Sequence, residues 1–330
     1  MITTTDIFTI SSQKQFEKIA LKVFRFQYEY NLVYKEFCDF LKTDLQKVKS
    51  IEQIPFLPIQ FFKSHQVVSK NPETSGLIQQ TFTSSGTTGM VTSNHFVTDI
   101  TLYEESYRKG FTQFYGNIEN YVILALLPSY LEREGSSLIY MVEDLIQMTN
   151  NLNSGFYLYN NEELIEKLIR LDNSGQNVIL IGVTYALLDL IESKKFQLKN
   201  TIIMETGGMK GKRKEMIRDE LHEQLCQGFS VTAIHSEYGM TELLSQAYSL
   251  GNGVFECPSW MQILVRDTED ALTYVPVGRS GGINVIDLAN INSCSFIATQ
   301  DLGKKNPNSS FEVLGRFDNS DIRGCNLMVV

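Results

Sequence analysis

A run of seven small residues, five of which carry hydroxyl groups, is the segment of this sequence best suited to bind phosphate. Its two glycines allow positive φ angles and a close approach of the backbone to a ligand. Backbone N–H groups and hydroxyls in such a loop can donate to phosphate oxygens. The run is not a Walker loop, because no Gly-Lys-Ser/Thr follows it; the alternative is a flexible linker. Its members are Thr83, Ser84, Ser85, Gly86, Thr87, Thr88 and Gly89.

Polar residues suited to a nucleotide follow two predicted strands further along the chain. Gly207 and Gly208 form a pair against which a flat ligand can lie. The later run from 235 to 242 supplies an aromatic ring at Tyr238, a hydroxyl at Thr241 and a carboxylate at Glu242 that could hold Mg²⁺. Because ligands bind outside the carboxyl ends of strands in open α/β sheets, we expect these groups to meet there.

A third predicted strand end carries Asp301, whose carboxylate could accept hydrogen bonds from ribose hydroxyls, and Arg316 lies near a later turn. Each group also has an ordinary structural interpretation. Glu242 could be a carboxylate at a helix start, Asp301 a turn residue and His235 a hydrogen-bonded structural imidazole. These interpretations do not account for the order in which all the motifs occur.

The elements that must position these residues alternate between strands and helices, which indicates βαβ units and a mostly parallel, buried sheet. Beyond Gly239 the pattern changes to strands separated by turns, with little helical signal after residue 250. The expected strands are 121–127, 178–181, 201–204, 231–234, 261–265, 282–286 and 295–299, and the expected helices are 137–148, 162–171, 185–195 and 212–225.

The N-terminal part is expected to be a helical arm followed by an extended segment. Ser12 and Gln15 have the spacing of a capping box, and apolar residues then recur on one helical face. Prolines rule out a continuous helix up to Pro58. We therefore expect an arm over 1–70 and a two-lobed core over 71–330, mainly α/β over 71–250 and rich in strands over 251–330.

Composition excludes several classes of protein. The 330 residues carry a net charge of −9, so no basic footprint for nucleic acid is present. The sequence contains neither a polybasic patch nor a long apolar segment, so we do not expect stable membrane insertion. The five cysteines are scattered and the first residues contain no secretory leader, which predicts a cytoplasmic protein without a disulfide framework.

The ordered set of motifs from Thr83 to Asp318 resembles the adenylate-forming enzymes, and within them the LuxE-type acyl-protein synthetases. The doubled serine of the loop and the segment from Leu57 to Ser64 carry the closer resemblance. The phenylacetate-CoA ligases are more distantly similar. This resemblance implies the α/β fold of the superfamily's N-terminal domain, with layered βαβ sheets and a more β-rich second lobe.

The resemblance also implies roles for the residues, with ATP and Mg²⁺ as cofactors. The loop hydroxyls of Ser84, Ser85, Thr87 and Thr88 would bind the phosphates. Gly207 and Gly208 would enclose adenine together with Tyr238 and the adjoining Gly239. Thr241 would touch the α-phosphate, Glu242 would hold Mg²⁺, and Asp301 and Arg316 would bind ribose. His235 and Met240 would border the acid.

The sequence departs from the superfamily pattern at its lysines. The loop lacks the usual following lysine, because Met90-Val91-Thr92 comes after Gly89. The chain stops shortly after Asp318, so we expect the mobile C-terminal domain and its lysine to be absent. Lys210 or Lys212 could substitute electrostatically; the alternative is that both lysines belong to a solvated helix start. Cys325 lies where LuxE-type enzymes carry an acyl group, and Arg323 nearby could favour its thiolate.

The expected activity is ATP-dependent conversion of a carboxylic, preferably fatty, acid to an acyl-adenylate. The acyl group would then pass to a protein thiol, which is Cys325, a partner protein or a carrier. The alternatives are an acyl-CoA ligase, or a partner subunit that binds nucleotide or acyl groups with weakened catalysis.

Overall fold

The structure of the chain, a computed structural model, describes residues 2–70, 76–84, 92–127, 135–158, 160–207, 213 and 216–317. The helices are α1 (Thr4–Phe8), α2 (Gln13–Tyr30), α3 (Leu32–Phe40), η1 (Ile51–Gln53), α4 (Phe61–Ser64), α5 (Ile100–Tyr115), η2 (Ile118–Asn120), α7 (Ser137–Met148), α8 (Asn161–Asn173), α9 (Thr184–Ser193), α10 (Arg218–Phe229) and η3 (Leu288–Asn290). The strands are β1 (Leu57–Pro58), β2 (Gln80–Thr83), β3 (Asn94–Val97), β4 (Val122–Leu126), β5 (Gly155–Tyr157), β6 (Val178–Val183), β7 (Thr201–Thr206), β8 (His235–Tyr238), β9 (Ala247–Ser249), β10 (Val254–Glu256), β11 (Met261–Arg266), β12 (Ser280–Asp287), β13 (Phe296–Lys305) and β14 (Phe311–Arg316).

One mixed sheet of twelve strands runs through both halves of the molecule in the order β11-β12-β13-β14-β10-β9-β8-β7-β6-β4-β5, with β1 paired to β13. The strands β5, β4, β6, β7 and β8 are parallel, and those from β8 to β11 pair antiparallel. Every residue of β4 and β6 is buried, as expected for parallel strands covered on both faces.

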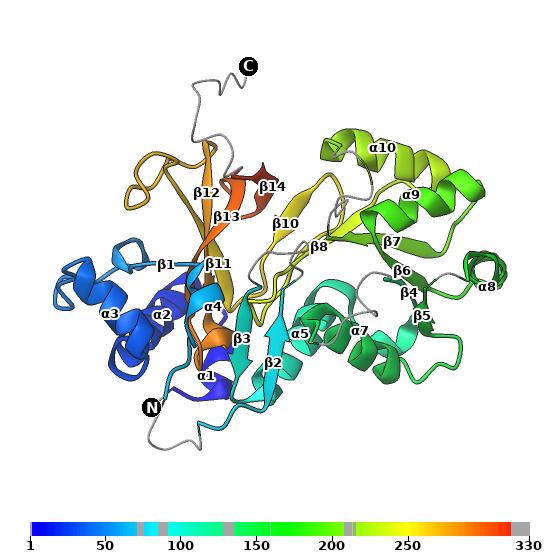
Figure 1. Ribbon diagram of the computed structural model, residues 1–330. Coiled ribbons are helices and arrows are strands. Elements are labelled where there is room, and N and C mark those ends of the chain that lie inside the picture. Colours follow the sequence, from blue (N-terminus) through cyan, green and yellow to red (C-terminus); the bar gives the residue numbers. More distant parts are fainter. Residues whose placement is uncertain are drawn as a thin grey trace.

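Helices cover both faces of the parallel strands. Figure 1 shows α5 and α7 on one side of this part of the sheet and α9 and α10 on the other. Helix α9 lies closest to the sheet at Gly182 of β6, where an added Cβ would lie 2.7 Å from Leu187 Cδ2 of α9. This glycine therefore sets the packing distance between β6 and α9.

The N-terminal arm packs against the β-rich half of the sheet (Figure 1). The Ser12 side chain accepts from the Gln15 backbone N–H and begins α2, whose residues Phe16, Ile19 and Val23 are buried as predicted. Leu57 and Pro58 then pair in parallel with Ile297 and Ala298 of β13. The extended segment thus attaches the arm to the strand that carries Asp301.

Three sequence predictions about elements were wrong in position. The strand expected at 231–234 is instead β8, four residues later, because Ser230 adopts a left-handed conformation and ends α10. Residues 235–237 pair with β7 and residues 236–238 pair with β9. The helix expected from 212 begins at Arg218, and β13 continues to Lys305. Tyr238 and Asp301 consequently lie within strands rather than beyond their ends.

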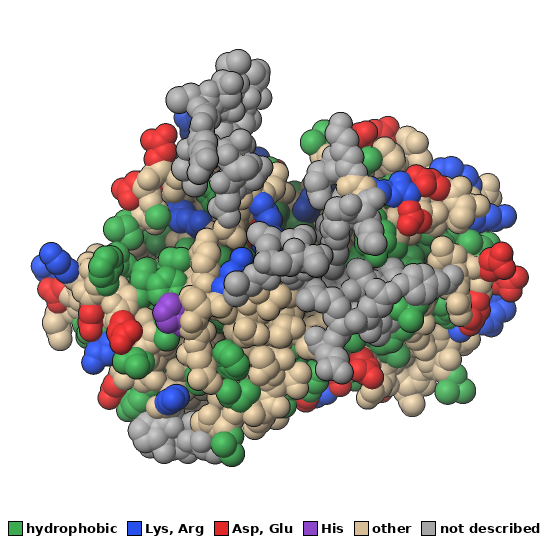
Figure 2. All heavy atoms as spheres, viewed as in Figure 1, with side chains coloured by type: hydrophobic (Ala, Val, Ile, Leu, Met, Phe, Trp, Pro, Cys, Tyr) green, Lys and Arg blue, Asp and Glu red, His purple; other side chains and the backbone are tan. Residues whose placement is uncertain are grey.

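The surface carries both signs of charge. On the face drawn in Figure 2, among the residues coloured by type, Lys and Arg are interspersed with Asp and Glu rather than gathered in one patch. No helix in the described ranges combines the length and apolar character needed to cross a bilayer.

Candidate functional site

The turn that follows β8 is fixed by two buried side chains from distant parts of the chain. His95 Nδ1 of β3 lies 2.8 Å from the Thr241 carbonyl oxygen, and its Nε2 lies 3.0 Å from Asn290 Oδ1. The Asn290 amide donates to the carbonyl oxygen of Glu242 at 2.8 Å. Burial lowers the pKa of His95 to about 4, so the ring is neutral near pH 7. Thr241 and Glu242 are therefore held rigidly against β3 and η3.

A buried carboxylate secures the chain just after this turn. Asp287 accepts hydrogen bonds from the backbone N–H groups of Leu244 and Ser245, at 2.7 and 3.0 Å, and from the Ser245 hydroxyl at 2.6 Å. Burial raises the pKa of Asp287 to about 6, against the lowering effect of these donors. Sequence reasoning missed His95, Asn290 and Asp287, because nothing in their local spacing indicates partners so far along the chain.

The base of the hydroxyl-rich loop lies near Glu242. The Ser84 N–H donates to the Ser93 carbonyl at 3.0 Å, and the Ser93 N–H donates to Ser84 Oγ at 2.8 Å, so the two ends of the loop are tied together. Burial raises the pKa of Glu242, and the nearby Ser93 hydroxyl acts in the opposite direction. Thr83, the last residue of β2, donates its N–H to Gly135. Ser85, Gly86, Thr87, Thr88 and Gly89 lie outside the described residues.

Tyr238 and Asp301 form a buried pair between the two halves of the sheet. The Tyr238 hydroxyl donates to Asp301 Oδ2 at 2.8 Å, and Arg316 Nε lies 3.1 Å from Asp301 Oδ1. The Tyr238 ring packs edge-on against Phe255 and Phe311. Burial and the neighbouring Asp301 carboxylate raise the pKa of Tyr238 well above its ordinary value, so its hydroxyl stays protonated. The structure therefore brings together three residues that are widely separated in the sequence.

The end of β7 lies beside Tyr238. Thr206 and Glu237 are register partners, and Gly207 follows with φ +68°, a conformation that favours glycine. Gly208, Lys210 and Lys212 lie outside the described residues, as does Cys325. At Gly239 an added Cβ would lie 2.4 Å from Glu237 Oε1, so a larger residue there would displace the end of the Glu237 side chain.

His235 and Met240 lie at opposite ends of this segment. His235 begins β8, and its Nδ1 is 3.2 Å from the hydroxyl of Tyr115 on α5. Burial lowers the pKa of His235. Met240 is partly buried against the hydrophobic core, and its carbonyl accepts from the N–H of Leu243 at 3.1 Å.

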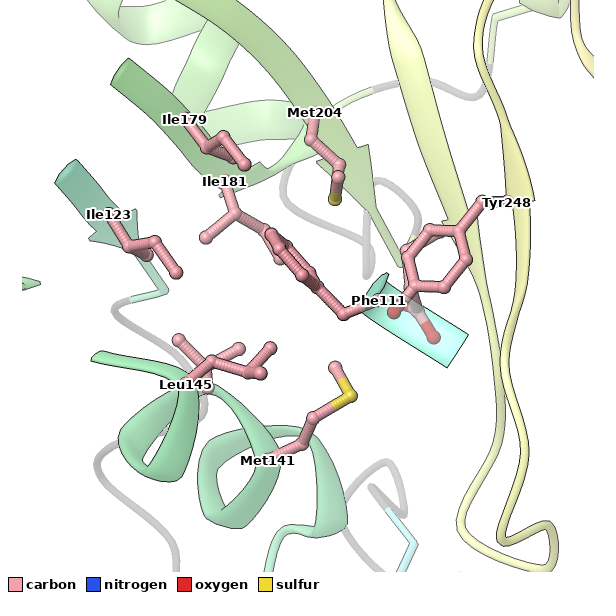
Figure 3. A pocket seen from close by; sticks show the side chains of 10 residues that line it. Phe111, Ile123, Met141, Leu145, Ile179, Ile181, Met204 and Tyr248 are labelled. Atoms are coloured by element: carbon pink, nitrogen blue, oxygen red, sulfur yellow. The ribbon is translucent and has the colours of Figure 1, made fainter. Parts of the chain in front are cut away.

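An apolar cavity lies on one side of β8, between the sheet and the helices α5 and α7. Figure 3 shows Phe111, Leu145, Ile181 and Met204 converging on it. Its volume is about 20 Å³, room for about one water molecule. Glu237 contributes the carboxyl group among the lining residues. Burial raises the pKa of Glu237 to about 7, with a smaller contribution from the charge of Glu205.

The alternation of β8 separates two environments. Glu237 faces the cavity, whereas Tyr238 faces Asp301 and the β-rich half. Glu237 was not singled out in the sequence analysis. Had the strand been placed at residues 235–238, the alternation of side chains would have put Glu237 on the face opposite Tyr238.

Glu242 is suited to Mg²⁺ in the presence of a nucleotide. No group of three or more His, Cys, Asp or Glu side chains that could hold a metal occurs within the described ranges. Mg²⁺ typically takes one or two carboxylates together with substrate phosphates. A single carboxylate at the base of the loop fits that pattern.

Comparisons with known proteins agree with these features. The sequence model of the family "acyl-protein synthetase, LuxE" matches residues 1–107 and 140–330. No curated protein matches the chain in sequence.

Solved structures share the fold at low identity. ATP-bound MatB from Rhodopseudomonas palustris is 17% identical, with a TM-score of 0.54, over 72% of this chain and 47% of MatB. A 2-hydroxyisobutyryl-CoA ligase with 2-HIB-AMP, in the postadenylation state, is 12% identical, with a TM-score of 0.66, over 95% of this chain and 70% of the ligase. The chain spans about half the length of MatB. The α/β fold predicted from the motifs is confirmed.

Proposed function

The chain belongs to the LuxE acyl-protein synthetase family, and from this premise we propose that it activates a carboxylic acid with ATP and transfers the acyl group to a protein thiol. The observation that carries the proposal is the convergence around β8. Within five residues, this segment holds the Tyr238 ring, paired with Asp301, and the Glu242 carboxylate, which is close enough to Ser93 at the base of the loop for that hydroxyl to act on its pKa.

The nucleotide would occupy the Tyr238 side of β8. Tyr238 would stack on adenine, with Gly207, Gly208 and Gly239 giving close access to its other edges. Asp301 would accept from the ribose hydroxyls, with Arg316 beside it. The hydroxyls and N–H groups of residues 83–89 would donate to the phosphates.

The phosphate chemistry would take place at the turn after β8. Mg²⁺ held by Glu242 would supply charge neutralisation at the phosphate oxygens. An oxygen of the acid would form a bond to the α-phosphorus, and the bond from that phosphorus to pyrophosphate would break. Thr241 would donate to the α-phosphate in this step, and Lys210 would add positive charge.

The second half of the reaction would be acyl transfer. A thiolate would attack the acyl carbonyl carbon, the bond to AMP would break, and AMP would leave with its electron pair. We propose Cys325 as the first acceptor within this chain. The cavity beside β8 has mostly apolar walls, which supports a fatty acid as substrate, although its volume of about 20 Å³ would have to increase to admit an alkyl chain. His235 and Met240, which the sequence places near the acid, are not among its lining residues.

Acid-dependent exchange of labelled pyrophosphate into ATP tests the activation step. Exchange is expected with some members of a panel of fatty acids, and Glu242→Gln is expected to lower it. Absence of exchange across fatty and aryl acids, with Mg²⁺ present, would refute the proposal.

Mass spectrometry after incubation with ATP and acid tests the acceptor. An acyl adduct that is lost in Cys325→Ser and kept in the control Cys226→Ser would support acylation of Cys325. An unmodified chain with free acyl-AMP would point to an external thiol, and an acyl-CoA product formed at the rate of acid consumption would indicate a CoA ligase instead.

A further inference from the structure

Strand β13 is irregular at the point where it carries Asp301. The pairing of β12 with β13 shifts register between Gly282 and Asn284. Across this shift β12 advances by two residues and β13 by four, so that residues 299–301 stand opposite Ile283 alone. Bulges of this kind interrupt the ladder of hydrogen bonds and re-aim side chains, often next to active sites. This bulge therefore determines where the Asp301 carboxylate points.

The guanidinium group of Arg266, on the neighbouring strand β11, holds the bulge together. Its Nη1 donates to the Ile283 carbonyl oxygen at 2.8 Å and to Asn284 Oδ1 at 2.7 Å. Its Nη2 donates to the Thr299 carbonyl oxygen at 2.5 Å. Ile283 belongs to β12 and Thr299 to the bulge of β13, so one side chain bridges the two strands where their ladder is interrupted. The rigid fork of arginine suits this task, because its donors point to several acceptors at once.

The surroundings of the guanidinium group are built to contain it. At Gly282 an added Cβ would lie 2.6 Å from Arg266 Cζ, so a larger residue would compete for the same space. Arg266 is 8% exposed, and the three oxygens that accept from it are uncharged. Burial of a cation among uncharged partners costs free energy, and hydrophobic residues often replace buried charges without loss of stability. Stability alone therefore does not account for a guanidinium group here.

A short chain of hydrogen bonds leads from Arg266 to Asp301. The Thr299 hydroxyl donates at 2.9 Å to the same Ile283 carbonyl oxygen that accepts from Arg266. The Asp301 N–H then donates to Thr299 Oγ1 at 3.1 Å. Arg266 thus fixes the backbone of Asp301 through Thr299, and the Asp301 carboxylate accepts from the Tyr238 hydroxyl at 2.8 Å.

We propose that Arg266 is a positioning residue, which holds this bulge and thereby orients the Asp301 carboxylate toward Tyr238 and the ribose of the nucleotide. Arg266 itself would not touch the nucleotide. Orientation matters because hydrogen bonds weaken steeply when their distance and angle depart from the preferred range. The part of the inference that concerns ribose rests on the proposed function.

The first test compares the pyrophosphate exchange of ATP with that of 2′-deoxyATP and 3′-deoxyATP. If Asp301 accepts from ribose hydroxyls, at least one deoxy analogue should have a kcat/KM about tenfold or more below that of ATP. Arg266→Met should reduce this preference to within about threefold, mainly through a higher KM for ATP, because the carboxylate is no longer aimed at the hydroxyl. Arg266→Lys keeps the charge but lacks the fork, so it should also lose most of the preference.

Lys305→Met is the matched control. Lys305 is a partly buried cation on the same strand as Asp301, and its Nζ donates to an uncharged oxygen, the Ile263 carbonyl, at 3.0 Å. It lies outside the bulge. Its replacement is expected to lower stability while leaving the preference for ATP over the deoxy analogues within about twofold of the wild type, as for a site with no shared partners.

A double-mutant cycle tests the positioning without catalysis. Tyr238→Phe removes the hydrogen bond to Asp301, so the shift that it causes in the urea unfolding midpoint reports how well the carboxylate is placed. This shift should fall to less than half in the Arg266→Met and Arg266→Lys backgrounds and stay unchanged in the Lys305→Met background. Arg266→Lys, the milder change, serves both experiments if Arg266→Met does not fold.

Two results would overturn the inference. One is a wild-type preference for ATP that the folded Arg266 variants keep. The other is an equal midpoint shift of Tyr238→Phe in every background. If no acid supports exchange, the proposed function fails; if the wild type uses both deoxy analogues as well as ATP, only the ribose role of Asp301 fails. In either case the cycle decides whether Arg266 positions the carboxylate.

Discussion

Replacing Tyr238 by phenylalanine removes one hydroxyl group from the centre of the molecule and leaves its packing intact. The ring keeps its contacts with Phe255 and Phe311, so no cavity forms. The bond that is lost is a 2.8 Å hydrogen bond to the buried carboxylate of Asp301. Hydrogen bonds to charged groups contribute about 1.5–3 kcal/mol, so we expect Tyr238→Phe to lower the free energy of unfolding by about 2 kcal/mol.

Arg316, the other partner of Asp301, behaves differently. Its side chain is 71% exposed, and ion pairs in that environment contribute about 0–1 kcal/mol. Arg316→Ala should therefore cost clearly less stability than Tyr238→Phe, although both residues bind the same carboxylate. If Arg316 binds ribose as proposed, Arg316→Ala should lower the affinity for nucleotide while changing the free energy of unfolding only slightly.

Urea unfolding at pH 7, followed by circular dichroism, measures both changes. The chain provides a matched control, because the Tyr28 hydroxyl donates to Asp39 at 2.6 Å at an exposed site. Tyr28→Phe should shift the unfolding midpoint much less than Tyr238→Phe. The reasoning fails if the two Tyr→Phe variants lose equal stability, or if Arg316→Ala costs as much as Tyr238→Phe.

Three further predictions concern the same region. His95→Ala removes the ring between Thr241 and η3 and opens a void, so it should lower the free energy of unfolding by about 3 kcal/mol in urea titrations; a loss no larger than that of the exposed His65→Ala would contradict this. Glu242→Gln should reduce acid-dependent pyrophosphate exchange at saturating Mg²⁺ by about 100-fold or more while leaving the unfolding midpoint nearly unchanged; exchange within fivefold of the wild type would rule out the carboxylate as a metal ligand. Glu237 has a pKa of about 7 in the folded state against an ordinary value of 4.5, so the folded state binds its proton more tightly and the contribution of this group to stability falls as pH rises from about 4.5 to 7. Glu237→Gln should therefore gain stability relative to the wild type between pH 5 and pH 8, and an equal difference in unfolding midpoint at the two pH values would contradict the assigned shift.

The sequence was sufficient for the order of motifs and for most of the elements. Continuous apolar runs located the buried strands β4 and β6. The helix α7 was predicted with the bounds that the structure shows, Ser137–Met148. The same approach misplaced β8. The apolar residues Val231 to Ile234 have the higher intrinsic β propensity, but pairing with β7 and β9 selects His235 to Tyr238.

The supports of the candidate site were beyond the reach of local patterns. His95 contacts a carbonyl 146 residues away in the chain, and Asp287 binds backbone N–H groups 42 and 43 residues away. Single polar residues in such roles have no periodic or spacing signal, because their partners are determined by how the sheet folds back on itself. The residues that hold a site are therefore harder to predict than those that contact a ligand.

The division of β8 into two faces has a consequence for how enzymes of this kind can diverge. Under the proposed function the acid and the nucleotide lie on opposite faces of β8, so single substitutions on the cavity face would leave the residues proposed for the nucleotide in place. Insertion or deletion of one residue in this strand would instead exchange the two faces and abolish both functions at once. Natural variation in this strand should therefore consist of substitutions at fixed length.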